Sequence, residues 1–445
     1  MAPKRLAIVG LGPKGAAIGA KATVLREAGF NSPDIVIFEP NEAGSAWSGK
    51  YGYTDGNQEL CTLAERDVGY PYDRASYSTS KFSGVAEGMF KRFSWHTFSV
   101  SRGVASSSYD DWVMRGRRPP LHRDFASYID FVVTQSNASV EAQAVTRIAH
   151  DSGAKRWSIS TARGVYNEPF DGVVITGSGA ALPPLPNSNH RVLDGKTFWQ
   201  SIPYMRSLLD AEKPQDRSIA IIGGGGTAAA VALWFVRSGI RKIPIRIIGR
   251  DASLYARVPS YFEDRLFSDS DEWTELAPHV QDAFIARLTR GVVWNSVLQS
   301  LNNARNLTYM SFSARAFSRV PPYRRGVPDD LILELDHPPT NSTAGAVSSG
   351  PPVQLLDSTI YVDARGFDPW WFVNLMPTGP LQYYFGSSPR QAIIDRLDDS
   401  LAIEDVAHFP RGLHLPMLAS RQGPAAPNLM ALGWMADAIL RPYSY

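Results

Sequence analysis

The chain has 445 residues, which exceeds what one ordinary hydrophobic core sustains, so two or three domains are expected. Its 45 basic and 43 acidic residues nearly balance, and no basic surface for nucleic acid is predicted. The one cysteine, Cys61, excludes an internal disulfide, a C-x-x-C dithiol and a thiolate zinc site. The histidines show no metal-ligand spacing, and no metal is expected.

Neither a signal peptide nor a membrane span is visible in the sequence. The first apolar run covers only residues 6–9, and no stretch approaches the roughly 18 apolar residues of a spanning helix. A cytoplasmic protein without membrane contact is therefore expected.

Residues 4–40 predict a compact unit of strand, glycine turn, helix and strand. The turn at residues 10–15 matches G-x-G-x-x-G directly after an apolar strand. Gly10 makes the tight turn, Gly12 lets the backbone approach a diphosphate, and Gly15 lets the helix pack on the strand. The diphosphate is expected at the helix N-terminus, where free N–H groups favour an anion.

The acidic residue at the end of the second strand predicts which nucleotide this unit binds. Glu39 can accept hydrogen bonds from ribose hydroxyls and disfavours a 2′-phosphate, so FAD or NAD fits this unit and NADP does not. The predicted contacts of this nucleotide are Gly10, Gly12, Pro13, Gly15 and Glu39. The family resemblance described below adds Trp47 to them.

The segment that follows lacks clear periodicity. Residues 41–125 are rich in Gly, Ser, Tyr, Trp and Pro, and predict long loops and short helices of functional importance. His122 is expected at the surface, at the start of a helix. Residues 143–177 predict a β-meander and a final strand, and residues 427–445 predict one more strand and a closing helix.

Residues 218–250 repeat the pattern of strand, glycine turn, helix and strand. The turn fits G-x-G-x-x-A, and the second strand ends in Arg250 where the first unit has Glu39. A guanidinium suits a 2′-phosphate, so this unit is predicted to bind NADPH. The predicted contacts are Gly223, Gly224, Gly225, Thr227, Ala228 and Arg250.

The two units predict an α/β protein with two Rossmann-like dinucleotide-binding domains, for FAD and NADPH, and a smaller inserted substrate region. We expect an N-terminal FAD domain over residues 1–200 and an NADPH domain with a substrate-side helical segment over 201–325. Residues 326–445 are expected to return to the FAD domain and close it. Two such sites in one chain imply that NADPH reduces the flavin, and without a dithiol partner oxygen is the natural next acceptor.

The order of these motifs resembles the class B flavin-dependent monooxygenases, and within them the N-hydroxylating enzymes that act on ornithine, lysine and related amines. In "GSAWSGKYGYTDGNQELCT", Trp47 resembles a tryptophan of this family and Gln58 its glutamine beside the flavin ring. The "YFEDRLF" segment stands where the family has F-x-N-E-x-F, and "RGVVWNSVLQSL" resembles its T-N-Y-S segment. Asn295 would match the asparagine that orients nicotinamide and substrate amine.

The resemblance implies a reaction and a set of site residues. Oxygen would add to the reduced flavin to give a C4a-hydroperoxide, whose distal oxygen a neutral amine attacks while NADP⁺ stays bound. Gln58 and Asn295 would act at the catalytic centre. The family lysine that holds a substrate carboxylate falls near Leu63, and Arg66 is proposed in its place, with Asp264 replacing the family asparagine.

The leading prediction is thus an NADPH- and O2-dependent monooxygenase that N-hydroxylates a small amine or amino acid, as in siderophore or other secondary metabolism. One alternative is another class B monooxygenase, of the S-oxidising or Baeyer–Villiger type. A second alternative is a flavin-binding, non-catalytic or regulatory protein. A homo-oligomer is left open.

Overall fold

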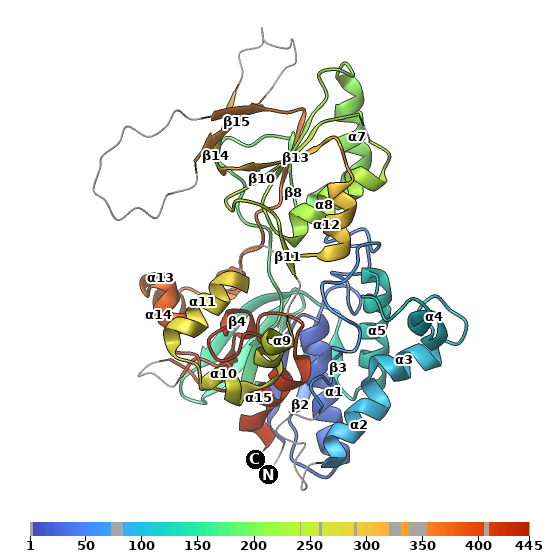
Figure 1. The fold of residues 1–445 in the computed structure, drawn as a ribbon. Helices are drawn as coiled ribbons and strands as arrows, with labels where there is room; N and C mark the ends of the chain where they lie inside the picture. The colour runs from blue at the N-terminus through green and yellow to red at the C-terminus, as the bar shows by residue number, and fades with distance from the viewer. Residues whose placement is uncertain are drawn as a thin grey trace.

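The computed structural model describes residues 3–72, 83–240, 242–257, 260–288, 292–319, 331–337, 354–404 and 409–444. Two bodies lie one above the other, and both chain termini lie together at the far end of the lower body (Figure 1). No helix in these ranges is long and apolar enough to cross a bilayer.

The lower body is built on a parallel five-stranded sheet. Its strand order is β18-β7-β1-β2-β3, and the pairing of Leu6 with both Ile35 and Gly172 sets the register. The central strands are almost entirely apolar because helices and a smaller antiparallel sheet bury them from both sides. The strands are β1 (Arg5–Val9), β2 (Asp34–Phe38), β3 (Ser139–Glu141), β7 (Gly172–Ile175) and β18 (Leu413–His414).

Helix α1 (Pro13–Glu27) packs along α15 (Leu432–Ser444), and both lie among the buried elements of this body (Figure 1). The segment expected to form loops and short helices does so, as α2 (Ser83–Phe93), α3 (Trp95–Ser101), α4 (Tyr109–Met114) and α5 (His122–Gln135). The expected meander is present as β4 (Val145–Asp151), β5 (Arg156–Thr161) and β6 (Gly164–Val165).

The upper body contains a second parallel sheet of order β13-β10-β9-β17-β8. Its strands are β8 (Val192–Asp194), β9 (Ile219–Ile222), β10 (Ile245–Gly249), β13 (Leu307–Ser311) and β17 (Ile360–Asp363). The helices around it are α6 (Thr197–Gln200), α7 (Ile202–Ala211), α8 (Gly226–Arg237) and α12 (Asn295–Asn302). The predicted fold class, α/β with two Rossmann-like units, is confirmed.

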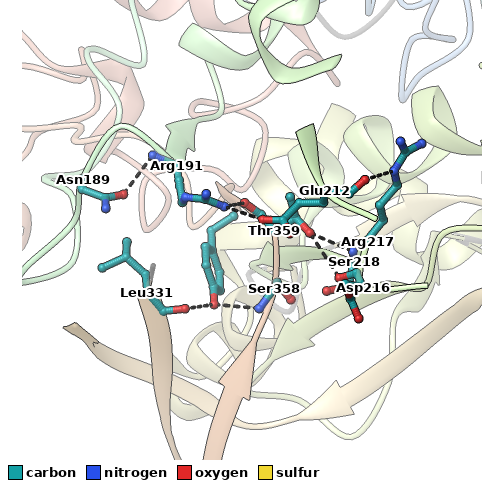
Figure 2. Close-up of polar contacts among 10 residues, drawn as sticks. Asn189, Arg191, Glu212, Asp216, Arg217, Ser218, Leu331, Ser358 and Thr359 are labelled. Atoms are coloured by element: carbon teal, nitrogen blue, oxygen red, sulfur yellow. Dashed lines mark hydrogen bonds and ion pairs between the residues drawn. The ribbon is translucent and has the colours of Figure 1, made fainter. Parts of the chain in front are cut away.

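Two smaller sheets complete the strands of the upper part. The antiparallel one contains β14 (Ser313–Arg319), β15 (Leu331–Asp336) and β16 (Gln354–Asp357), and the parallel pair contains β11 (Tyr255–Arg257) and β12 (Val292–Trp294). A buried polar network joins the antiparallel sheet to the large one (Figure 2).

In this network Arg191 lies 3.4 Å from the Glu212 carboxylate and donates to the Thr359 carbonyl at 3.1 Å (Figure 2). The Tyr361 hydroxyl donates to the Leu331 carbonyl at 2.8 Å. These bonds fix β8, α7, β17 and β15 to one another, while Arg191 Nε and Ser358 Oγ are buried without a hydrogen-bond partner among the described residues.

The chain between α8 and α12 crosses back to the lower body. Helices α9 (Tyr261–Ser268), α10 (Ser270–Thr274) and α11 (Pro278–Leu288) lie there, beside α13 (Pro380–Ser387) and α14 (Arg390–Ile394) (Figure 1). Phe267 of α9 packs in a small core with Ala425 and Met430.

The predicted domain boundaries of 1–200, 201–325 and 326–445 stay a prediction. Strands β8 and β17, which lie outside 201–325, belong to the second sheet. The prediction of a strand in the C-terminal tail is wrong, because the residues directly before α15 form turns and bends. Two short 3-10 helices, η1 (Trp371–Leu375) and η2 (Pro416–Leu418), complete the described elements.

Candidate dinucleotide-binding and active site

The first glycine turn has the geometry that a bound diphosphate requires. Gly10 has φ +106°, and a Cβ there would lie 2.7 Å from the Thr176 hydroxyl. A Cβ on Gly15 would lie 2.5 Å from the Gly10 carbonyl oxygen, so α1 can approach β1 only with glycine here. At Gly12, which caps α1, a Cβ would meet no atom within 4 Å. The turn is therefore closed towards the protein and open on the side where a diphosphate would lie.

Glu39 lies directly at this turn. Its buried carboxylate accepts the backbone N–H of Leu11 at 3.1 Å, and its other oxygen accepts the N–H of Asn41 at 3.1 Å. The predicted ribose-binding carboxylate and the predicted diphosphate-binding turn are thus in contact.

Lys14, also in this turn, is directed away from the open side. Its ammonium donates to the Ala426 and Asn428 carbonyls, at 2.5 and 2.8 Å, and so connects α1 with the loop before α15. Burial lowers the pKa of Lys14 to about 7.

The second turn repeats these features. Gly223 has φ +134°, and a Cβ there would lie 2.4 Å from the Ala364 carbonyl oxygen of the neighbouring strand end. Gly225 caps α8 without any side-chain hydrogen bond, which leaves the first N–H groups of the helix available for an anion. Ala228 is buried at the third motif position, and Gly224 lies against Gly249.

Arg250 follows β10 directly and is exposed. Because β9 and β10 are parallel neighbours, Arg250 and the second glycine turn lie at the same edge of the sheet. This is the position that the sequence predicts for a group that recognises a 2′-phosphate.

A cavity of about 280 Å³ lies between the two bodies. It brings together three of the predicted residues, Trp47 and Gln58 of the first body and Thr227 at the start of α8. The remaining walls are aromatic or small, and the lining comprises Ala46, Tyr53, Thr54, Glu59, Cys61, His122, Ser178, Trp199, Gly226, Ala229, Ala230, Val293, Trp294, Val297 and Phe367.

His122 lines the cavity. The prediction that it lies at the surface is therefore wrong. Its ring meets Trp47 edge-on with centroids 4.8 Å apart, and Nδ1 lies 3.0 Å from the Thr54 hydroxyl. Burial lowers the pKa of His122 to about 4, so the imidazole is neutral near pH 7. Its position at the start of α5 was predicted, but the return of the loop around Trp47 onto that helix was not.

Hydrogen bonds between side chains of the upper body and the loop at residues 57–59 connect the two bodies. The Ser296 hydroxyl of α12 donates to the Glu59 carboxylate at 2.5 Å, and Arg237 of α8 donates to the Asn57 carbonyl at 3.4 Å. Asn295, the predicted nicotinamide-orienting residue, is the first residue of α12 and its side chain is exposed. It adjoins the lining residue Trp294, and its role stays a prediction.

The two predicted substrate residues contact each other beside this cavity. The Arg66 guanidinium lies 2.8 Å from Asp264 Oδ2. A third charged residue, missed in the sequence, joins them, since Arg257 interacts electrostatically with both and with Cys61 of the cavity wall. Among the described residues, Asp264 Oδ1 and Arg257 Nη2 are buried without a hydrogen-bond partner.

Two glycine turns, each between a buried parallel strand and a helix, define a fold with two dinucleotide-binding units, and comparisons with known proteins specify it further. The sequence profile of L-lysine 6-monooxygenase/L-ornithine 5-monooxygenase matches residues 91–308. The L-lysine N6-monooxygenase MbtG of Mycobacterium tuberculosis is 31% identical over 440 residues, with 98% of this chain and 94% of that protein covered.

Two solved structures have a fold similar to that of this chain. The lysine monooxygenase NbtG of Nocardia farcinica, described with an unprecedented NADPH domain conformation, is 29% identical at a TM-score of 0.77, covering 98% of this chain and 100% of that one. An ornithine N-hydroxylase from Kutzneria sp. 744, described with reduced FAD, NADP⁺ and L-ornithine, shares the fold at 16% identity and TM-score 0.68, covering 99% of each chain.

The chain therefore belongs to the L-lysine 6-monooxygenase/L-ornithine 5-monooxygenase family. The predicted family and the predicted enzyme class, an N-hydroxylating flavin monooxygenase, are confirmed. The predicted cofactors, FAD and NADPH, agree with the pair described for the Kutzneria structure.

Proposed function

We propose that this protein N-hydroxylates the side-chain or terminal amine of a small amino acid or diamine, with NADPH and O2 as co-substrates. The observation that carries the proposal is that Trp47, Gln58 and Thr227 line one and the same cavity. Hydride transfer requires the two cofactors to meet, and this cavity is where a ligand on each glycine turn can reach the other.

The residues present fit both cofactors. The turn from Gly10 to Gly15, with Glu39, would hold FAD, and the turn from Gly223 to Ala228, with Arg250, would hold NADPH. When bound, the flavin accepts hydride from the nicotinamide and activates oxygen for transfer to nitrogen.

The protein's own contribution is to keep this chemistry dry and to place no added positive charge beside the amine. Trp47 and His122 cover one side of the cavity with packed rings, and His122 is neutral. A neutral imidazole neither protonates the attacking amine nor repels it, and excluding water prevents the loss of oxidising equivalents as peroxide. Gln58, buried in the wall, supplies an amide for orientation.

We infer that the charged cluster beside the cavity binds the end of the substrate that does not react. Arg66 and Asp264 already neutralise each other, so neither offers a full charge. Asp264 Oδ1 and Arg257 Nη2 remain as one buried acceptor and one buried donor. Asp264 Oδ1 can accept a hydrogen bond from the ammonium of an α-amino acid, and Arg257 Nη2 can donate one to its carboxylate. A substrate that lacks one of these two groups leaves the matching protein atom buried without a partner.

The test is a steady-state assay on the FAD-loaded protein with L-lysine, L-ornithine and cadaverine. NADPH oxidation and hydroxylamine product are measured together. We expect equal amounts of both for an amino acid, and a kcat/KM about tenfold lower for cadaverine, which lacks the carboxylate. NADPH oxidation that yields only peroxide with every amine would contradict the proposed function. Equal kcat/KM for all three amines would contradict only the role of the charged cluster.

Arg250→Ala is expected to raise the Kd of NADP⁺ about 10- to 100-fold and to leave the Kd of NAD⁺ unchanged, because a guanidinium–phosphate contact is charge-assisted. Isothermal titration calorimetry of both nucleotides measures this. The matched control is Arg305→Ala, an equally exposed arginine that precedes β13 at the opposite edge of the same sheet. Loss of affinity for both nucleotides, or for neither, would show that Arg250 does not bind the 2′-phosphate.

We further propose that the protein is cytoplasmic, and whether it forms a homo-oligomer stays open.

A further inference from the structure

One buried donor in the wall of the cavity has no partner in the described part of the chain. Trp199 of α6 is 9% exposed and lines the cavity together with Gly226 and Thr227 of α8. Its indole Nε1 is buried and makes no hydrogen bond to any described residue. Trp95 and Trp112 also have an indole nitrogen without a partner, but only the Trp199 indole lies in the wall of this cavity, where its N–H, a donor only, can reach an acceptor supplied from outside the chain.

The segment that carries Trp199 is held rigidly. The Asp194 carboxylate accepts the backbone N–H groups of Lys196 and Thr197, both at 2.7 Å. The Asp194 N–H in turn donates to the Thr197 hydroxyl at 2.9 Å. These three bonds fix the turn that leads into α6, the helix that carries Trp199.

The turn at residues 194–197 contacts both α8 of the upper body and the loop around Tyr53 of the lower body. A Cβ on Gly195 would lie 2.9 Å from Thr227 Cγ2, so the turn contacts the first residues of α8. The Lys196 ammonium lies 4.8 Å from the centre of the Tyr53 ring, on the other side of the cavity. Trp199 therefore stands between the anion-binding end of α8 and the loop of the lower body.

We propose that Trp199 is a cofactor-binding residue whose indole N–H donates a hydrogen bond to an oxygen of the bound nicotinamide dinucleotide, beside its diphosphate. The inference rests on the proposed NADPH site at α8. Both observations point to the same ligand, since the uncapped first turn of the twelve-residue helix α8 and the unpartnered indole share one cavity. The acceptor belongs to the part of the cofactor that NADP⁺ and NAD⁺ have in common.

Trp199→Phe on the FAD-loaded protein tests this. We expect the Kd of NADP⁺ and of NAD⁺, measured by calorimetry, to rise by the same factor of about ten, because a neutral donor to a charged acceptor is lost. The flavin content and Tm should stay at the wild-type values. The equal effect on both nucleotides separates Trp199 from Arg250, whose loss affects NADP⁺ alone.

The matched control is Trp234→Phe. Trp234 packs on the same Phe198 ring as Trp199, at 5.5 Å against 4.9 Å, but does not line the cavity. Its removal should leave both Kd values unchanged. If Trp199→Phe binds NADP⁺ as tightly as Trp234→Phe, the inference is wrong.

A measurement on the wild-type chain covers the case in which Trp199→Phe folds poorly. In protein labelled with ¹⁵N at the tryptophan indoles, the Trp199 Nε1–H signal should move downfield when NADP⁺ is added. The signal is assigned on the wild-type chain, through the sequential connection of Trp199 to Phe198 and Gln200. A saturated complex without such a shift would overturn the inference, whereas a wild-type chain that binds no NADP⁺ would overturn the proposed second site itself.

Discussion

Asp437→Asn is expected to lower the free energy of unfolding by about 3–5 kcal/mol, because it removes one partner of a buried ion pair. Asp437 of α15 lies 2.9 Å from the ammonium of Lys21 of α1, and both side chains are only 1% exposed. Asparagine keeps the shape but removes the charge, so the buried Lys21 ammonium loses the Asp437 carboxylate as its counter-charge. Urea unfolding at pH 7 measures the change.

The double variant Lys21→Met, Asp437→Leu is the informative control. It removes both charges, so most of the lost stability should return. Asp34→Asn breaks the exposed ion pair with Arg26, whose side chains are 43% and 44% exposed, and should cost less than about 1 kcal/mol. If Asp437→Asn costs no more than Asp34→Asn, the buried pair does not hold α1 to α15.

The prediction of the fold succeeded where local sequence decides structure. Parallel strands buried on both faces are continuous apolar runs, and glycines at fixed spacing mark the turns that follow β1 and β9. The return of α9–α11 to the lower body was not predicted, because it depends on packing between residues far apart in the chain. Phe267 against Met430 is such a contact, and neither segment alone indicates the other.

Only part of the candidate site could be predicted, because the rest also depends on packing between residues far apart in the chain. Residues tied to a motif, such as Gly12 and Thr227, lie where the pattern places them. His122 and Trp199 belong to no motif, and only the approach of the two bodies makes them cavity residues. Arg66 and Asp264 were both assigned to the substrate, but their ion pair follows from the position of α9 in space.

Gly12→Ala is expected to abolish FAD binding while leaving the fold intact. Gly12 has φ −87° and ψ −168°, an extended conformation open to any residue, and a Cβ there meets no protein atom within 4 Å. The added methyl group therefore costs the free protein little. It occupies the open side of the turn, where the diphosphate of FAD would approach the backbone, and so acts only against the ligand.

We expect the Kd of FAD to rise at least about 100-fold, equivalent to about 2.8 kcal/mol, and the purified protein to be colourless with an unchanged Tm of the flavin-free form. Gly84→Ala, on the exposed side of α2 with no atom within 4 Å, is the neutral control and should keep its flavin.

Gly10→Ala should lose both flavin and stability, because its φ of +106° and the Thr176 hydroxyl at 2.7 Å strain the protein itself. The contrast between Gly12 and Gly10 separates a ligand contact from a folding requirement. A yellow Gly12→Ala protein with full flavin content would place the diphosphate away from this turn, and the assignment of FAD to the first unit would then be wrong.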